Sequence, residues 1–149
     1  MDEPVAGTVP PRRPGRGTLV LQYATVAVFL LGAVHPLLAA AIGTGDWAGL
    51  ADPTLERYGD PKDWALPPGP DAPWNPLLWI IAVSRVAVMV SGITVLGLAG
   101  VVAGVARIAG RGVGRGRWLA LLVGTLLCAA VTVVTLTPYG AQLRTWLLD

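Results

Sequence analysis

The chain has 149 residues, of which 54% are hydrophobic and only 13% are charged. An ordinary water-soluble domain carries about 25% charged residues, so the composition favours a membrane protein. The net charge of +2 comes from basic residues that lie in short, separate segments, not in the broad patch that a nucleic-acid-binding protein needs, and we expect no nucleic-acid partner.

Residues 1–17 are rich in Pro, Gly and Arg and hold almost nothing to bury, which predicts a disordered, basic cytoplasmic tail. The apolar stretch at 18–42 follows, and a helix needs about 20 such residues to cross about 30 Å of hydrocarbon. We therefore expect a first transmembrane helix at 18–42. An alternative makes this stretch a signal peptide that is cleaved after the small residues 39–41.

His35 and Pro36 interrupt the first helix. Because proline has no amide hydrogen, the carbonyl of Gly32 loses its helical partner, and we expect a distortion between Gly32 and Pro36. His35 is the single histidine of the sequence. It is interpreted either as a neutral side chain bonded to a neighbouring helix or as a group that transfers a proton or recognises a quinone-like or lipid headgroup.

An outer loop is expected at 43–75, a segment that contains six acidic residues and two basic residues, Arg57 and Lys62. The pairs Asp52–Pro53 and Asp60–Pro61 predict short helical turns, since each offers an N-cap followed by proline. Tryptophan favours the headgroup level, so the loop is expected to lie on the outer leaflet; a lid or a docking surface is the alternative. The predicted interfacial anchors are Trp47, Trp64, Trp74, Trp79, Trp118 and Trp146.

A second transmembrane helix is expected at 76–109. Arg85 either marks its outer boundary or lies below the headgroups and binds an anionic or carbonyl group. Glycines at helical spacing predict a packing face, because small residues let helices approach closely in lipid, and this face is also the expected dock for a partner protein or a second copy. The face comprises Gly97, Gly100 and Gly104.

A cytoplasmic Gly/Arg loop at 110–116, which lacks the spacing of a phosphate-binding loop, leads to a third helix at 117–137. Cys128 is the single cysteine, so it predicts packing and neither a disulfide nor a metal site. The short outer tail at 138–149 is expected either to extend the third helix past a kink or to form an interfacial turn anchored by Leu143, Trp146 and Leu147.

The basic residues fix an expected orientation. By the positive-inside rule, the arginine-rich segments place the amino terminus in the cytoplasm and the carboxyl terminus outside. The use of Arg in place of Lys favours a GC-rich bacterial host, and hence a bacterial plasma membrane. The segments contain Arg12, Arg13 and Arg16, then Arg107, Arg111, Arg115 and Arg117. The fold class is therefore all-α: a polytopic membrane protein with a three-helix transmembrane bundle and a Trp/Pro/Asp-rich outer loop.

Polar groups inside a membrane are energetically costly and are often functional. Polar residues in the outer half of the membrane therefore outline a candidate pocket. The pocket would comprise His35, Arg85, Ser91, Thr132 and Thr135. No cofactor, metal site or catalytic residue is predicted, and we expect no enzyme, since general acid and base catalysis needs positioned titratable groups and the spans hold a single histidine, His35.

Three functions are compared. The leading hypothesis is a small accessory or assembly subunit of a bacterial envelope complex, which acts through helix contacts in the lipid bilayer. The second is a lipid- or quinone-binding protein that uses His35 and Arg85. The third is a holin-like, pore-forming oligomer, although the pore-lining charge that ion passage needs is missing from the sequence.

Overall fold

The computed structural model describes residues 15–64, 75–110 and 113–148, and within these ranges the regular structure is entirely helical. The predicted helical class is therefore confirmed. The elements are α1 (Arg16–Phe29), the π-helical turn η1 (Leu30–Val34), α2 (His35–Thr44), the 3-10 turn η2 (Ala48–Leu50), α3 (Leu55–Tyr58), α4 (Pro76–Met89), α5 (Gly92–Ala109), α6 (Arg115–Leu136) and α7 (Pro138–Leu148). The expected tail before residue 15 and Trp74 lie outside the described residues.

Within the described ranges, three helices are long and apolar enough to cross a membrane, as predicted. The first runs without a break through α1, η1 and α2, from Arg16 to Thr44, and the others are α5 with 18 residues and α6 with 22. At 1.5 Å per residue, α5 and α6 are about 27 Å and 33 Å long, which matches the hydrocarbon thickness. The chain is thus a membrane-embedded protein by these three helices.

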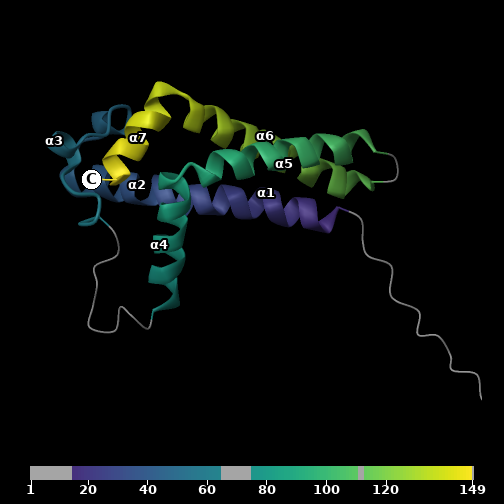
Figure 1. Cartoon of the computed structure of the whole chain (residues 1–149), viewed down its shortest axis with the longest axis horizontal. Coiled ribbons are helices and arrows are strands. Elements are labelled where there is room, and N and C mark those ends of the chain that lie inside the picture. The colour runs from purple at the N-terminus through teal and green to yellow at the C-terminus, as the bar shows by residue number, and fades with distance from the viewer. Residues whose placement is uncertain (1–14, 65–74, 111–112, 149) are drawn as a thin grey trace, which may run out of the picture.

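The two ends of the bundle differ. Helices α5 and α6 lie side by side along α1 (Figure 1). We call the end where α1 begins, α5 ends and α6 begins the arginine end, since Arg16, Arg107, Arg115 and Arg117 lie there. At the other end, α2 continues past the bundle, and η2, α3 and α7 gather around it (Figure 1). We call these four elements the cap.

The single helix expected at 76–109 is wrong. The structure forms α4 and α5 instead, with a break at Ser91, whose φ of 58° is left-handed and incompatible with a helix. Ser91–Gly92 is a Ser/Gly pair, one of the few recognised causes of sharp helix kinks. Because α4 has only 14 residues, it is too short to span, and it runs across the long axis of the bundle (Figure 1).

The close crossing of α4 over η1 explains the glycine at position 32. The expected distortion is present as the π-helical turn, in which the His35 amide donates to the carbonyl of Leu30. A Cβ on Gly32 would lie 2.6 Å from the backbone carbon of Ser84 and 2.9 Å from the nitrogen of Arg85. Only glycine lets the two backbones approach this closely, so η1 is the contact that positions α4.

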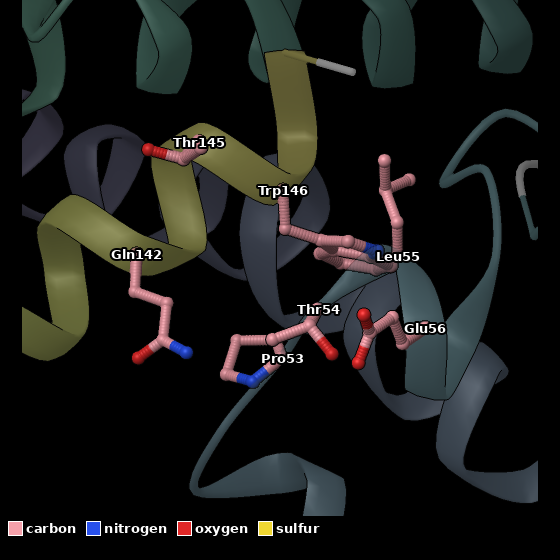
Figure 2. A pocket seen from close by; sticks show the side chains of 7 residues that line it. All are labelled: Pro53, Thr54, Leu55, Glu56, Gln142, Thr145 and Trp146. Atoms are coloured by element: carbon pink, nitrogen blue, oxygen red, sulfur yellow. The ribbon is translucent and has the colours of Figure 1, made fainter.

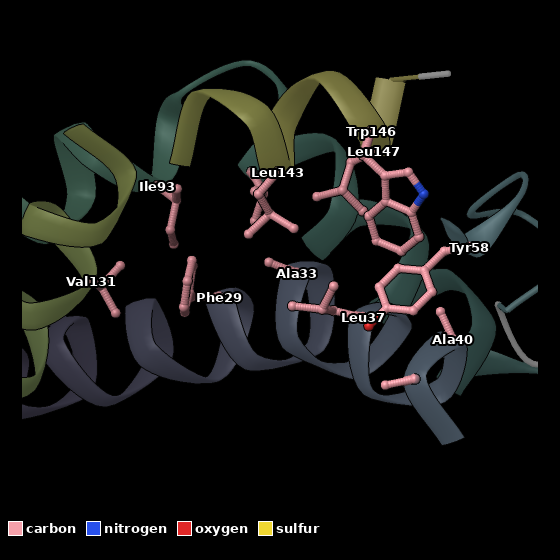
Figure 3. Close-up of a cluster of buried hydrophobic side chains, with 12 residues drawn as sticks. Phe29, Ala33, Leu37, Ala40, Tyr58, Ile93, Val131, Leu143, Trp146 and Leu147 are labelled. Carbon is pink, nitrogen blue, oxygen red and sulfur yellow. The ribbon is translucent and has the colours of Figure 1, made fainter. Parts of the chain in front are cut away.

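The core of the cap joins α7 to α2 and α3. Trp146 of α7 is 1% exposed, and its ring packs edge-on against Tyr58 with centroids 5.8 Å apart (Figure 3). Its indole N–H donates to the carbonyl of Gly59 at 3.1 Å. The outer tail is therefore a helix folded into the cap. The predicted lipid anchoring by Trp146 is wrong because its ring is buried in this core. The other members of the cluster in the cap are Leu37, Ala40, Ala41, Leu143 and Leu147.

The remaining tryptophans divide into packed and exposed groups. Trp64 packs on the glycine surface at Gly43, and its N–H donates to the carbonyl of Tyr58 at 2.5 Å. Trp47, Trp79 and Trp118 are exposed and stay candidates for interfacial anchoring. The helical turn expected from Asp52–Pro53 starts later than predicted, since α3 begins at Leu55.

Candidate functional site

The five residues of the predicted polar pocket do not form one pocket. Arg85 reaches from α4 to α7, where Nη2 donates to the carbonyl of Leu147 at 3.1 Å. Ser91 accepts a hydrogen bond of 2.6 Å from Nη1 of Arg144, also on α7. Both residues therefore connect the α4 corner to the cap, away from the interior of the bundle.

Two threonines of the predicted pocket instead lie in the contact between α5 and α6. The Thr132 hydroxyl donates to the carbonyl of Cys128 at 2.8 Å, and its side chain fills the space above Gly97. Thr135 accepts a hydrogen bond of 3.0 Å from the hydroxyl of Thr94. These groups satisfy one another between two spans, so they serve helix packing.

His35 stands apart from these contacts. Its Nδ1 atom is buried and has no hydrogen-bond partner among the described residues, while the side chain as a whole is half-buried. The expected hydrogen bond to a neighbouring helix is thus absent at Nδ1. The prediction grouped His35 with the other four residues by their depth in the membrane alone. In the structure the five side chains make different contacts, so they do not share one site.

The glycine face of α5 is occupied by the chain itself. Gly97, Gly100 and Gly104 are all buried against α6 and α1. A Cβ on Gly100 would lie 2.8 Å from Sγ of Cys128, and one on Gly104 would collide with Thr125 and Gln22. The face that the sequence offers to a partner is therefore filled within the molecule.

A buried amide, that of Gln22, lies at the centre of the bundle and is not among the predicted site residues. Gln22 of α1 is fully buried, and its Nε2 donates to the Gly100 carbonyl at 3.0 Å and to the Thr125 hydroxyl at 2.9 Å. Its Oε1 lies against Gly124 and has no hydrogen-bond partner in the part of the chain that the structure describes. The available signal was a lone amide inside an apolar span, because such a group must find partners on neighbouring helices.

The side of α4 that turns away from the bundle is apolar, and most of its large side chains are exposed within the described part of the chain. The helix buries Ile81, Ser84 and Val88 against the chain, with Arg85 at the edge of that side. Its large exposed residues are between 47% and 70% exposed. They are Leu77, Trp79, Ile80, Val83 and Val86, with Val90 directly after the helix.

A shallow pocket of about 470 Å³ lies on the cap, between α7 and the start of α3 (Figure 2). Glu56 and Thr54 supply polar groups on one side, and Gln142 and Thr145 on the other. Trp146 closes its floor but is almost fully covered by the cap core. Among the predicted residues the pocket includes Trp146, an expected interfacial anchor, and none of the residues of the predicted polar pocket.

The described residues hold no group of three His, Cys, Asp or Glu side chains that could bind a metal ion. In this part of the chain, the ion pairs are Arg57–Asp46 at 3.4 Å and Lys62–Asp60 at 3.5 Å, both within residues 45–64. Comparison with known proteins finds no protein-family model, no curated protein and no solved structure that matches the chain.

Proposed function

We propose that the protein is a non-enzymatic accessory or assembly subunit of an envelope complex in a bacterial plasma membrane, and that it docks on an integral membrane partner through α4. The observation that carries the proposal is the exposed apolar surface that Ile80, Val83 and Val86 form on this helix, with Val83 65% exposed among the described residues. The glycine face of α5 does not support the docking role, because its space is taken by α6 and Gln22.

The character of α4 favours a protein partner over a lipid surface. A helix that lies at a membrane interface presents a strongly polar face to water and an apolar face to the acyl chains. On α4 the polar side chains Ser84 and Arg85 turn toward the chain, and the exposed surface formed by Ile80, Val83 and Val86 is apolar. An apolar surface on a helix that is too short to span the membrane favours contact with a protein, so a helix of the partner is the expected cover.

The protein holds α4 in a fixed position for docking. The helix is fastened by the Gly32–Ser84 crossing and by the bonds of Arg85 to Leu147 and of Arg144 to Ser91. Preorganisation of this kind lowers the entropic cost of binding. A docking element that is rigid before the partner arrives is consistent with a subunit that acts by contact.

The charge distribution supports an orientation with the arginine end in the cytoplasm. The four described arginines of the arginine end are exposed. At the cap end, the loops within residues 45–64 carry acids such as Asp46, Asp52 and Asp63. By the positive-inside rule the amino terminus is then cytoplasmic and the carboxyl terminus extracytoplasmic. The α4 surface would meet its partner at the outer leaflet.

The two competing functions have less support. A quinone- or lipid-binding pocket built from His35 and Arg85 lacks the convergence of polar groups that such a pocket requires. A pore-forming oligomer needs a polar stripe on the outside of its spans. The outward residues of α5, such as Val95, Leu98 and Val102, are apolar instead.

Co-purification from the native host in mild detergent tests the proposal, with co-purifying proteins identified by mass spectrometry. The double change Ile80→Ser and Val83→Ser makes the α4 surface polar, and Leu98→Ser with Val102→Ser makes the same change on the lipid-facing side of α5. We expect a stoichiometric partner that the α4 variant loses and the α5 variant retains. Equal retention by both variants, or the absence of any stoichiometric protein, would refute docking through α4.

A further inference from the structure

Two arginines join α4 and α7 from opposite sides, and we call the contact between these helices the α4–α7 seam. Arg85 of α4 donates to the Leu147 carbonyl of α7 at 3.1 Å and to the Pro61 carbonyl at 3.5 Å. Arg144 of α7 donates to the Ser91 hydroxyl at 2.6 Å, at the corner that follows α4. Both side chains are half-buried.

Within the described ranges, neither guanidinium lies within ion-pair distance of a carboxylate. Arg57 and Lys62 each form an ion pair with a carboxylate, whereas the partners of Arg85 and Arg144 are neutral oxygens. Asp60 acts on Arg85 only from a longer distance and is itself paired with Lys62. Half-buried charges without a direct ion pair are costly near a membrane, and the buried Nε of Arg85 has no acceptor among the described residues.

The seam lies at the level where a bilayer presents phosphate. Ser91 directly precedes α5, and α7 follows α6 after a single residue, Thr137. With α5 and α6 across the hydrocarbon, their shared end, and the seam beside it, fall at the headgroups of one leaflet. A guanidinium fork binds phosphate oxygens through two parallel N–H donors, and the hydrogen bonds to described residues leave donors of both forks available.

We propose that the α4–α7 seam binds the phosphate group of an anionic phospholipid between Arg85 and Arg144. The lipid supplies a directly bound negative charge at the depth where the two side chains lie. The site is independent of the docking surface, since it uses the seam side of α4 and not the apolar surface that includes Val83. It takes its ligand from the bilayer in which the three spans are embedded.

Native mass spectrometry of the full chain in detergent tests the proposal, with phosphatidylglycerol and phosphatidylcholine of identical acyl chains as probes. We expect tighter retention of phosphatidylglycerol, and a weakening of about fivefold in Arg85→Gln and in Arg144→Gln, which is the effect of one arginine near an anionic headgroup. Arg57→Gln is the matched control, because it removes one positive charge from the cap outside the seam. It should leave retention unchanged.

Ser91→Ala distinguishes a purely structural role of the seam from lipid binding, because it removes the hydrogen bond from Arg144 and keeps both positive charges. This variant should retain phosphatidylglycerol as well as the wild type, and thermal melting verifies that each variant is folded. Wild-type retention in a folded Arg144→Gln variant overturns the proposal, as does an equal loss in Arg57→Gln. Inorganic phosphate is the third probe, and its binding at the seam without lipid retention would overturn the assignment to a lipid.

Discussion

Gln22 and Thr125 are joined by a hydrogen bond of 2.9 Å, although 103 positions separate them in the sequence. The same Nε2 atom donates to the carbonyl of Gly100, so one amide connects α1, α5 and α6. The approach is close enough only because glycines line the amide, at Gly104 and at Gly124. Hydrogen bonds of this kind fix the relative depth of helices in lipid, where apolar contacts alone distinguish depth poorly.

Replacement of this amide gives the first prediction. Gln22→Met keeps the length of the side chain but removes both donated bonds, and we expect the free energy of unfolding in detergent to fall by about 0.6–1.7 kcal/mol. The loss stays modest because the Thr125 hydroxyl retains its bond to the Leu121 carbonyl. Unchanged stability, measured by denaturant titration, would show that the amide contributes nothing to the assembly of the three spans.

The glycines next to Gln22 give the second prediction. In Gly104→Ala the added methyl group would collide with the Thr125 hydroxyl and the Gln22 amide, so we expect a loss of about 1–3 kcal/mol. Gly116→Ala, in the first turn of α6, is the control because nothing lies within 4 Å of its Cβ position. Thermal melting followed by circular dichroism compares the two, and equal melting temperatures would argue against close packing at Gly104.

The sequence predicts the spans because hydrocarbon thickness constrains length and composition directly. The start of α4 at Pro76 is also predictable, since Asn75 caps the amide of Leu77 at 3.0 Å as a local motif. The break at Ser91 could not be predicted with the same ease. An apolar run that continues on both sides conceals it, and the Ser–Gly pair is equally typical of a packing face.

The candidate site was less predictable than the spans. Sequence gives the depth of a residue such as His35 or Thr135, but not the direction in which its side chain points once a π-turn has rotated the helix. The bond from Arg85 to Leu147 joins residues 62 positions apart, and it exists only because α7 folds back at Pro138. Contacts of this range follow from the packed tertiary structure and have no local signature.

The crossing of α4 over η1 gives the third prediction. Gly32→Ala would place a methyl group against the backbone of Ser84, which cannot move without the whole helix. We expect α4 to separate from the bundle, seen as faster hydrogen exchange of its amides. Gly17→Ala on α1 is the control because its Cβ position is open. Equal exchange of α4 in the two variants would contradict the close crossing.

The cap core gives the fourth prediction. Trp146→Ala removes a ring that is 1% exposed, and a buried tryptophan contributes about 3–5 kcal/mol relative to alanine, so we expect the cap to lose its fold. Trp47→Ala is the matched control, since that ring is 59% exposed. Limited proteolysis should cut the cap of the Trp146 variant first. Similar protection in both variants would mean that Trp146 serves as an interfacial anchor and not as a core residue.

Two tyrosines of the cap give the last prediction. Burial raises the pKa of Tyr58 above the usual value of about 10, with a further contribution from Asp46, and burial also raises the pKa of Tyr139. Each phenol donates to a carbonyl, Tyr58 to Asp46 at 2.7 Å and Tyr139 to Leu50 at 2.8 Å, so the folded cap requires the protonated form.

Because these folded-state pKa values are raised, the stability that the protonated phenols contribute is complete below about pH 10 and is lost as the pH rises through the folded values. Tyrosinate absorbance should therefore appear at higher pH in the folded protein than after denaturation, and cap stability should fall over the same range. Tyr58→Phe with Tyr139→Phe removes both titrations, so its stability should change less with pH there. An identical alkaline loss in this double variant would assign the pH dependence to other groups.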